Sequence, residues 1–484
     1  MIRCFSLYIQ VCFPLYFLLL HWLAPDTLDK GYITSVLIGV FAMLIVHYYV
    51  CYITHYDRRI VSIRNMFVLF FVVVYFQLPL DYVLGYNVRM NWFYKDSIFC
   101  ESLNFSALCL SLFLLGYSVL PISNKMSESS NQIRFPYVWP FVILAWLCFL
   151  LFVQRMGFSF FIGGYGAEGD GSTIGDGTAV RFFNYMQLFL KAVVVMIVWN
   201  IYNSKEKVNG VLSYLRFFPF PFMLLYLSII LLWFTAGGRA VSVTLFLFLY
   251  CGYILLSKKD IPLLYAFMLV IIGGVFFSVF KILGGLSFSH YEGLNISEAI
   301  SHGYTLYQSY SENATLFAPT RELAFSIYTY NIYYYWWTIG HIYGGLFLLL
   351  SLLGSIPFLM PLLSQIVGVD LNFYYLAKIV TEYDNANSGL GSSCVGELLC
   401  DVGFPATLLF FFLFALLFRK LDTIFQVRSK RFNLFEIVLT FSYFSTIFFA
   451  PRGSIVSGLT DSIFLYLVIE FYILFLPRKM LSYV

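Results

Sequence analysis

The sequence predicts an all-α membrane protein, a polytopic helix bundle of about fourteen transmembrane helices with large outer loops. The first observation is composition: 61% of the 484 residues are hydrophobic and only 11% are charged, whereas soluble domains carry about 25% charged residues. The second is that apolar runs of roughly 20 residues, the length that a helix needs to cross a bilayer, recur along the whole chain. The third is that alternating-strand patterning is absent, which excludes a membrane β-barrel.

The apolar runs give fourteen expected spans in chain order. The first run, 5–23, is too long for a signal peptide and lacks a small-residue cleavage site, so we expect it to be a span. The expected spans are 5–23, 32–53, 65–84, 99–120, 136–156, 181–202, 217–236, 239–257, 261–283, 322–339, 342–363, 403–419, 434–450 and 460–476.

The distribution of lysine and arginine predicts that both termini are cytoplasmic. With the N-terminus inside, the inner segments hold 18 of the 29 lysines and arginines, as the positive-inside rule requires. The inner groups include Arg58, Arg59 and Arg64, the pair Lys258 and Lys259, and a cluster over 419–431. We therefore expect a multi-pass membrane protein whose two termini lie on the cytoplasmic side.

Two alternatives remain open in the region between 322 and 363. Segment 325–339 is short and aromatic, so it is a weak span. If it does not cross, segment 346–363 is a re-entrant pair broken at Gly354 and Pro357, because an even number of crossings must separate the two cytoplasmic clusters. In both versions 381–405 faces outward.

The polar part of the chain is therefore external. We expect a single membrane domain, 1–484, whose outer loops 284–321 and 364–402 carry the active site, and a third outer loop, 157–178, that is glycine-rich and acidic. The cytoplasmic loops are short, and no GxxxxGK[ST] phosphate-binding motif occurs. These features argue against direct use of ATP and place any chemistry outside the membrane.

The most informative stretch is 381–405, a polar, glycine-rich segment in an otherwise apolar sequence. Gly389 and Gly391 permit unusual backbone conformations, and Ser392 and Ser393 are natural N-caps of a helix that would start there. Glu397 would lie near the first turn of that helix, with Asp401 four residues on along the same face. An anion-binding site at this helix start and an ordinary polar connection are both compatible with the pattern.

Three arginines lie at expected outer ends of spans. Arg239 follows a Gly-Gly pair between apolar runs, where a charge is costly unless it is paired or faces a cavity. Arg452 has similar surroundings, whereas Arg321 could simply pair with Glu322. The planar guanidinium suits phosphate oxygens, so these residues are candidate diphosphate ligands. A snorkelling interfacial arginine remains the alternative for Arg239.

Other residues have weaker interpretations. Lys191 lies within a span and should point into the bundle, with Glu470 as the expected counter-ion. Cys394 and Cys400, six residues apart on a helix, would face different directions, so we expect no disulfide between them. No cysteine or histidine cluster has metal-ligand spacing, so we expect neither a metal nor a cofactor.

Acid–base chemistry and sugar stacking also have candidates. His290 and Glu292, in the large outer loop, could act as acid and base, although a solvated histidine would look the same. An outer segment is crowded with aromatic side chains that suit an interfacial belt or stacking on sugar rings. These residues are Tyr328, Tyr330, Tyr333, Tyr334, Tyr335, Trp336 and Trp337.

Three short motifs together resemble the O-antigen polymerases, the Wzy proteins. Segment 389–403, in which Gly-Leu-Gly-Ser-Ser precedes Glu397 and then Asp401-Val402-Gly403, resembles their outer Gly/Ser-rich segment, glutamate and (Asn/Asp)-x-Gly. Gly237-Gly238-Arg239 resembles their Gly-Gly-Arg at an outer helix junction. Arg452-Gly453 resembles the arginine of their late outer turn.

This resemblance implies a membrane glycosyltransferase of the GT-C fold. Such enzymes polymerise undecaprenyl-diphosphate-linked oligosaccharide repeat units on the periplasmic side of the inner membrane, which gives O-antigen polysaccharide for lipopolysaccharide. Both the glycan donor and the acceptor are carried on undecaprenyl diphosphate, no nucleic acid is involved, and a co-polymerase can regulate chain length. The membrane lipid surrounds the enzyme, and no nucleotide sugar is used.

The residue chemistry then suggests roles. Positive charge on a leaving diphosphate stabilises the transition state, so the candidates are Arg239, Arg452 and Arg321. A carboxylate can take the proton of the attacking hydroxyl, for which Glu397 is the first choice and His290 or Glu292 the alternatives. Gly389, Gly391, Ser392 and Ser393 would contribute to substrate binding.

Two rival functions share the hydropathy. An O-antigen ligase would share the fold and the diphosphate site but transfer the glycan to lipid A core. A flippase for lipid-linked oligosaccharides would be a transporter, and it should show two similar halves. No matching halves occur here, and the Glu397 motif favours the polymerase.

Overall fold

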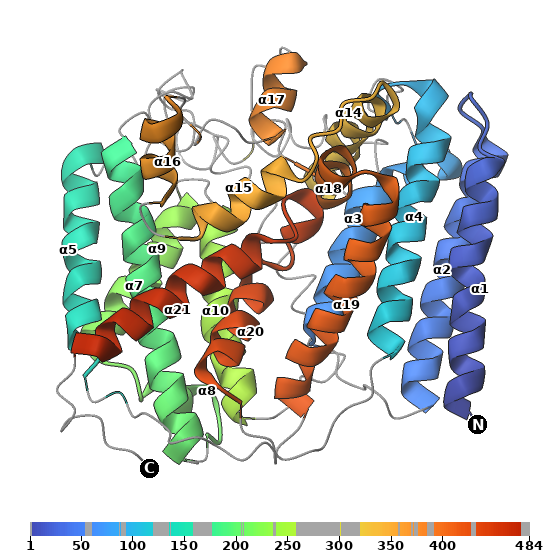
Figure 1. Ribbon diagram of the computed structural model, residues 1–484. Coiled ribbons are helices and arrows are strands. Elements are labelled where there is room, and N and C mark those ends of the chain that lie inside the picture. The colour runs from blue at the N-terminus through green and yellow to red at the C-terminus, as the bar shows by residue number, and fades with distance from the viewer. Residues whose placement is uncertain are drawn as a thin grey trace. The chain divides into compact units, whose positions relative to one another are not determined.

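The architecture comes from a computed structural model, in which every regular element among the described residues is a helix (Figure 1). The structure describes the chain outside residues 1, 54–60, 87, 89–92, 120–134, 136, 158–176, 205, 207, 236–238, 258–300, 302–319, 357–358, 369–370, 372–375, 385–391, 427–431 and 476–484. The all-α prediction is thus confirmed for the part of the chain that is described.

The chain divides into two compact units. Unit 1 comprises 1–124, 311–423 and 446–460, and unit 2 comprises 125–310, 424–445 and 461–484. Unit 1 holds α1 (Ile2–Trp22), α2 (Lys30–Ile53), α3 (Ile63–Leu84), α4 (Asp96–Val119), α13 (Arg321–Ala324), α14 (Ser326–Thr338), α15 (Leu346–Gly354), α16 (Leu359–Val367), α17 (Leu376–Tyr383), α18 (Cys394–Val402), most of α19 (Phe404–Gln426) and η6 (Ala450–Arg452). Unit 2 holds α5 (Trp139–Met156), α7 (Gly177–Ser204), α8 (Val211–Leu215), α9 (Phe220–Thr235), α10 (Arg239–Ser257), nearly all of α20 (Leu434–Thr446) and most of α21 (Ser457–Phe475).

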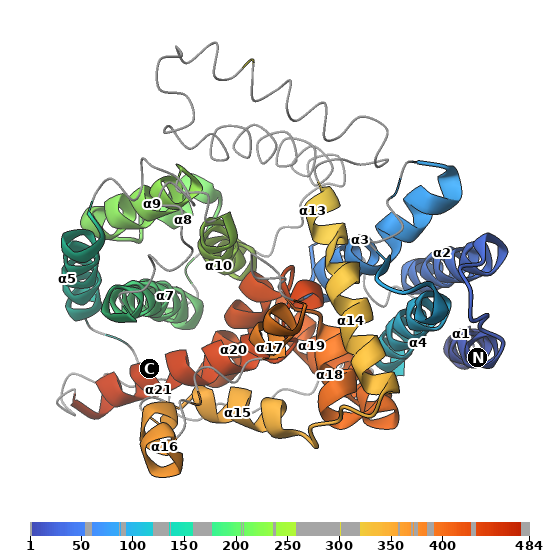
Figure 2. The same cartoon turned by 90° about the horizontal axis from the view of Figure 1, so that it is seen from above.

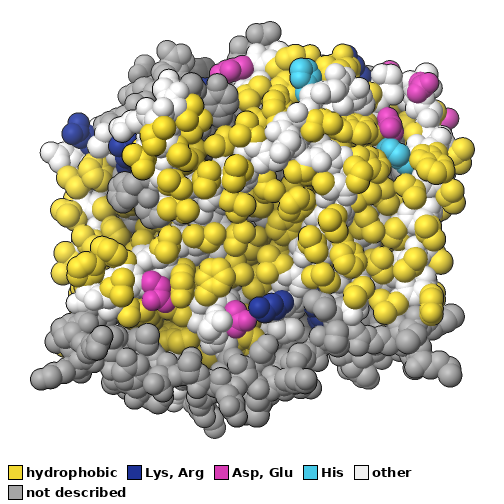
Figure 3. Space-filling view, in the orientation of Figure 1, with side chains coloured by type: hydrophobic (Ala, Val, Ile, Leu, Met, Phe, Trp, Pro, Cys, Tyr) yellow, Lys and Arg dark blue, Asp and Glu magenta, His cyan; other side chains and the backbone are white. Residues whose placement is uncertain are grey.

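Seven helices among the described residues are long and apolar enough to cross a membrane. They are α2, α3, α4, α5, α7, α10 and α21, and shorter apolar helices occur within α1, α9 and α20. Hydrophobic side chains cover most of the described surface that Figure 3 shows, and the few charged side chains visible there lie in the upper and lower parts of the view. A multi-pass membrane protein is therefore supported, whereas the expected count of about fourteen spans is not, and the expected span 261–283 lies outside the described residues.

The expected spans 322–339 and 342–363 are not formed as single crossing helices. The first contains α13 and the 13-residue α14, and the second contains two helices of nine residues each, α15 and α16. Nine helical residues rise about 14 Å, less than half of a hydrocarbon core of about 30 Å. Helix α15 ends at Gly354, the position at which the alternative interpretation broke the segment.

The long helices of unit 1 pack closely, and one of their contacts leaves no room for a side chain. A Cβ atom added to Gly116 of α4 would lie 2.7 Å from the backbone oxygen of Phe412 in α19. Around this contact Phe67 of α3 packs on Phe113 of α4 and Phe418 of α19, with ring centroids 4.6 and 5.8 Å apart. Helices α3, α4 and α19 therefore form one tightly packed group of three, which Figure 1 shows from the side and Figure 2 from above.

The ends of α3 and α19 hold a buried charge cluster that the sequence analysis placed in cytoplasmic loops. Arg64, Arg419 and Asp422 are each 1% exposed. One oxygen of Asp422 accepts from the backbone N–H of Ile63 at 2.8 Å, and the other accepts from the Tyr117 hydroxyl at 2.9 Å. Counting charges along the chain assigns each loop to a side of the membrane but does not show how deeply a residue is buried. Helix α19 also continues to Gln426, well beyond the expected boundary at 419.

In unit 2, the expected partner of Lys191 is wrong. The ammonium group of Lys191, in α7, lies 3.0 Å from a carboxylate oxygen of Asp461, in α21. Glu470 lies nine residues further along α21, about 14 Å in helical rise, and it is hydrogen-bonded to Tyr466. The sequence gives no information on which turn of a distant helix faces Lys191, so the position of Glu470 within an expected span was not enough to identify the partner.

Candidate functional site

Helix α18 begins where the sequence predicts a helix start. Ser393 has an extended backbone conformation, and its hydroxyl accepts from the backbone N–H of Gly396 at 3.2 Å. Ser393 is thus the N-cap, which satisfies one of the free N–H groups at the helix start. The helix runs from Cys394 to Val402 and ends at Gly403, whose φ of +81° favours glycine.

Glu397 lies in the first turn of α18 and is held by hydroxyl groups. The Ser392 hydroxyl donates to Glu397 Oε1 in a short hydrogen bond, and Ser454 supplies a second side-chain hydrogen bond. The Tyr333 hydroxyl lies 3.3 Å from Ser392 Oγ. Because the Ser392 proton points at Glu397, Tyr333 donates to Ser392, and a chain of neutral hydroxyls ends at the carboxylate.

This environment raises the pKa of Glu397 to about 7. The main cause is burial, which disfavours the charged carboxylate, whereas the hydrogen bonds from Ser392 and Ser454 lower the pKa and the charge of Asp401 raises it. A carboxyl group with this pKa is present in both protonation states near neutral pH, which is the condition for efficient general acid–base catalysis.

Asp401, on the same helix, has a structural role. It is 2% exposed, and its two carboxylate oxygens accept from the backbone N–H groups of Phe347 and Leu348 at 3.1 and 2.7 Å. These N–H groups belong to the first turn of α15, where a negative charge also interacts favourably with the helix dipole. Asp401 therefore holds α15 against α18. Both of its carboxylate oxygens already accept hydrogen bonds, so Asp401 is less available than Glu397 for acid–base chemistry.

Tyr75 joins three segments at the start of α18. This α3 residue is 0% exposed, and its hydroxyl lies 2.8 Å from Ser393 Oγ, 3.0 Å from the Pro451 carbonyl and 3.3 Å from the Val395 backbone N. A phenol donates only one proton, which goes to the carbonyl, so Ser393 and Val395 are the donors to Tyr75. All the hydrogen-bonding capacity of this hydroxyl is used to hold α18 against the 450–454 turn.

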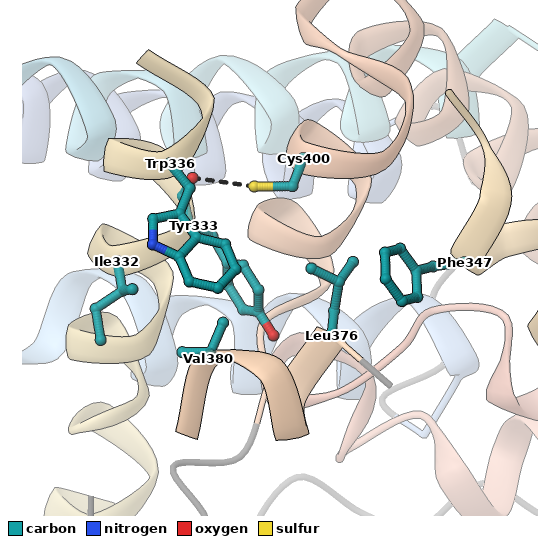
Figure 4. Close-up of a cluster of buried hydrophobic side chains, with 7 residues drawn as sticks. All are labelled: Ile332, Tyr333, Trp336, Phe347, Leu376, Val380 and Cys400. Carbon is teal, nitrogen blue, oxygen red and sulfur yellow. Dashed lines mark hydrogen bonds between the residues drawn. The ribbon is translucent and has the colours of Figure 1, made fainter. Parts of the chain in front are cut away.

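Helix α14 forms another wall of the site through a close contact with α18. A Cβ atom added to Gly396 would lie 2.6 Å from the Tyr333 ring, so only glycine allows the two helices to approach this closely. Cys400 adds a hydrogen bond from its Sγ to the Tyr333 carbonyl at 3.1 Å, and the surrounding cluster buries side chains from α14, α15, α17 and α18 (Figure 4). The sulfurs of Cys394 and Cys400 are free, as expected.

Arg452 belongs to the turn that closes the site. It is the last residue of η6, and its backbone carbonyl accepts from the Ser392 N–H at 3.3 Å. Its side chain is half-buried, and among the described residues no acidic side chain forms an ion pair with it. The structure therefore brings Arg452, Ser392, Ser393 and Glu397 together in unit 1.

The remaining predicted residues are not brought to this site by the described structure. Arg321 opens α13, which contacts α3 within unit 1, and Thr320 before it donates to Gln77 at 2.6 Å. Arg239 opens α10 in unit 2, and nothing is described of its side chain. The predictions for Gly389, Gly391, His290 and Glu292 lie outside the described residues.

Sequence reasoning missed two residues of the site and gave a third a different role. Tyr75 lies in an apolar helix, where a tyrosine looks like ordinary core, and nothing in the sequence singled out Ser454. Tyr333 was counted among the aromatic residues of an interfacial belt or a sugar-stacking surface. The one available signal was that buried tyrosine hydroxyls need hydrogen-bond partners, but that rule does not name the partner.

The arrangement holds a carboxyl group with a pKa of about 7 against the 450–454 turn, whose Arg452 has no acidic partner among the described side chains. Within that part of the chain, no group of three histidine, cysteine or acidic side chains is arranged to hold a metal ion. The chemistry that Glu397 offers is general acid–base catalysis, and the turn that carries Arg452 lies against the start of the same helix.

Comparison of the chain with protein-family models, with curated proteins and with solved structures finds no match.

Proposed function

We propose that this chain is a membrane glycosyltransferase that polymerises lipid-linked oligosaccharide repeat units, an O-antigen polymerase in type. The observation that carries the proposal is Glu397, a carboxylate held by neutral hydroxyls, with a pKa of about 7, beside the Arg452 turn. A fold alone does not specify an activity, so the proposed activity is inferred from this site.

In the proposed reaction, a hydroxyl of the acceptor glycan attacks the anomeric carbon of the donor glycan. The new bond joins the acceptor oxygen to that carbon, and the bond from the carbon to the diphosphate oxygen breaks. Glu397 takes the proton of the attacking hydroxyl. Undecaprenyl diphosphate leaves with the bonding electron pair, and no nucleotide, metal ion or cofactor is needed for the balance.

The second requirement of this reaction is that the negative charge that develops on the leaving diphosphate is stabilised. A preorganised cation next to the developing negative charge lowers the barrier because it needs no rearrangement during the reaction. Arg452 is the best-supported candidate, since the Ser392 N–H fixes its backbone carbonyl and the half-buried side chain has no acidic partner in the described structure. Arg239 and Arg321 are further candidates from the sequence, and the serines 392 and 393 hold the helix start in place.

The ordered α18 start also favours an enzyme over a flippase. Transporters place their binding site near the bilayer midplane at the interface of two repeats, whereas Glu397 lies on a short helix outside the candidate membrane spans. A ligase, which would use the same donor, is the closer alternative, and the choice between polymerase and ligase rests on the sequence motif around Glu397.

Deletion of the gene, followed by electrophoresis of the cell-surface lipopolysaccharide, tests the proposal. A polymerase defect leaves lipid A core that carries one repeat unit. Bare core would instead indicate a ligase or a flippase. Unchanged long glycan chains would contradict all three functions.

A further inference from the structure

A group of aromatic side chains forms a second surface feature in unit 1, distinct from the Glu397 site. Phe325 and Tyr328 stack with ring centroids 5.6 Å apart and planes 13° apart, and Tyr94 meets the edge of Tyr328 at 5.8 Å. At the end of α17, Tyr383 and Asp384 complete the group. We call Tyr94, Phe325, Tyr328, Tyr383 and Asp384 the tyrosine platform.

Hydrogen bonds fix the polar groups of this platform. The Tyr328 hydroxyl donates to one oxygen of Asp384 at 2.8 Å, and the hydroxyls of Tyr94 and Tyr383 interact with each other. Lys95, next to Tyr94, places its ammonium group 3.3 Å from the ring centroid of Tyr335. The platform therefore combines fixed aromatic rings with a carboxylate, an ammonium group and phenol hydroxyls at its edge.

The platform is exposed, and its backbone is held in a costly conformation. Tyr383 is 50% exposed and Phe325 is 38% exposed. Tyr94 has a φ of +68°, and it is the one non-glycine residue with positive φ in the described structure. Such a conformation is unfavourable for a side chain with a Cβ atom and is kept where its surroundings enforce it. The Tyr94 ring contacts Tyr328 in this conformation.

One helix connects the platform to Glu397. Helix α14 carries Tyr328 on the platform and, five residues on, Tyr333 in the hydroxyl chain that ends at Glu397. Trp336 of α14 packs edge-on against Tyr383 with centroids 4.8 Å apart, and it shares the buried cluster of Figure 4 with Val380 of α17 and Cys400 of α18. The platform and the candidate base are thus mounted on the same rigid group of helices.

We infer that the tyrosine platform binds sugar rings of the acceptor glycan whose hydroxyl group reacts at Glu397. A pyranose ring has an apolar face of C–H groups, which fits an exposed aromatic ring, and an edge of hydroxyls, which needs donors and acceptors. Asp384 and the phenol hydroxyls supply these groups. This inference rests on the proposed function and adds to it a glycan-binding subsite.

A lipid chain fits this surface less well. An acyl or polyprenyl chain offers no hydrogen bond to Asp384 or Lys95, and covering these charged groups with hydrocarbon in place of water would be costly. A glycan can hydrogen-bond to both while it covers the rings. The mixture of stacked rings with fixed polar groups therefore favours a carbohydrate.

The test uses the full chain in lipid nanodiscs and water-soluble repeat-unit oligosaccharide, released from the lipid carrier of the source cells by mild acid. Binding is measured by saturation-transfer NMR and by calorimetry for the unaltered chain, for the double variant Phe325→Ala/Tyr383→Ala and for Glu397→Gln. The double variant removes two exposed rings, so it should weaken binding by about tenfold or more. Glu397→Gln should bind as the unaltered chain does. Trp22→Ala, which removes a ring that is 78% exposed on α1, is the control and should also bind normally.

Turnover separates this inference from the proposed function. With lipid-linked donor and acceptor, the double variant should raise KM for the acceptor while kcat stays within about twofold, because uniform binding is lost. Absence of oligosaccharide binding by the unaltered chain, or equal binding by the double variant, overturns the platform even if polymerisation occurs. Binding that depends on the platform without any turnover would keep the glycan subsite and contradict the polymerase. Melting temperatures of all variants establish that each one is folded.

Discussion

Helices α3 and α19 both extend between two charged regions of unit 1. The carboxylates of these two regions have different surroundings. At one end, Asp422 is 1% exposed and accepts two backbone N–H groups and the Tyr117 hydroxyl, with Arg64 and Arg419 next to it. The guanidinium carbons of the two arginines lie 4.7 and 5.0 Å from the Tyr117 ring centroid. Every carboxylate oxygen there has a donor within the protein.

At the other end, Glu397 has neutral hydroxyl partners and is partly exposed. Burial raises the pKa of Glu397 and its hydroxyl donors only partly offset this, so the carboxyl group can exchange its proton near neutral pH. A fully buried carboxylate with donors on both oxygens stabilises the fold, whereas the partly exposed Glu397 remains available for chemistry.

The largest contrast should come from the same substitution in the two regions. Arg452→Ala should reduce polymerisation by about 100-fold or more, because removal of one stabilising group for transition-state charge has effects of this size. Gel electrophoresis of surface lipopolysaccharide should show loss of long glycan chains at an unchanged protein level. Arg452→Lys should restore little, since an ammonium group cannot bind phosphate through two parallel hydrogen bonds.

Arg64→Ala is the matched variant in the buried cluster. It should lower the protein level because Asp422 loses a neighbouring cation in the interior. Normal chains in Arg452→Ala, or a normal protein level in Arg64→Ala, would remove the distinction between the two regions.

Next in size is the effect of Asp422→Ala on stability. The variant removes the buried acceptor of two backbone N–H groups and of the Tyr117 hydroxyl, and each donor left unsatisfied should cost about 1–3 kcal/mol. The melting temperature of the purified chain in detergent is the measurement. Glu382→Ala is the control, because the Lys378–Glu382 pair is exposed and such pairs contribute about 0–1 kcal/mol. Equal losses in both variants would show that burial of the Asp422 cluster has no special weight.

Tyr75→Phe should have an intermediate effect that reaches both stability and activity. The variant leaves the Pro451 carbonyl and the Val395 N–H without their buried partner, at a cost of about 1–3 kcal/mol. Tyr226→Phe in unit 2 also removes a buried hydroxyl, one that donates to the Leu245 carbonyl at 2.7 Å. Both variants should lower the melting temperature, but only Tyr75→Phe should lower kcat, because only Tyr75 holds α18. Equal kcat in the two variants would contradict a positioning role for Tyr75.

The smallest expected effect is a shift in pH dependence. Activity should rise with pH through about 7 as Glu397 ionises, because a general base must be deprotonated. Ser392 donates to this carboxylate and lowers its pKa, so Ser392→Ala should move the rise to higher pH. If the pH–activity profile of Ser392→Ala is unchanged, Glu397 is not the group whose ionisation controls the rate.

The same pKa predicts a stability trend with a defined sign. The folded-state pKa of Glu397 lies above its unfolded value of 4.5, so its contribution to stability is fully present below pH 4.5 and is lost as pH rises through about 7. Glu397→Gln should remove this part of the pH dependence in thermal melts. A pH trend identical in the variant and the unaltered chain would contradict the raised pKa.

The sequence predicted the features that depend on local chemistry. Ser393 caps α18 because a serine followed by a helix-forming run is a local signal, and the two cysteines of α18 remain free for the same local geometric reason. The all-helical class followed from composition. These predictions need only the residues within a few turns of one another.

The features that depend on distant partners could not be predicted in this way. Lys191 pairs with Asp461, 270 residues away, and Tyr75 reaches Ser393 across 318 residues. Arg64 and Arg419 were assigned to loops because charge counting says nothing of burial. The aromatic residues of α14 did not indicate how deep in the membrane this segment lies. Its 13 residues are too few to span a bilayer.

The most direct test of the central claim is glycosyl transfer by purified Glu397→Gln in nanodiscs, with lipid-linked repeat units as both donor and acceptor. The glutamine keeps the size and hydrogen-bonding shape of the side chain but cannot take a proton, so kcat should fall by about 100-fold or more while binding of the acceptor is unchanged. Glu382→Gln, which alters an exposed carboxylate on α17, should transfer at the unaltered rate. Transfer by Glu397→Gln at the rate of the unaltered chain would contradict the account.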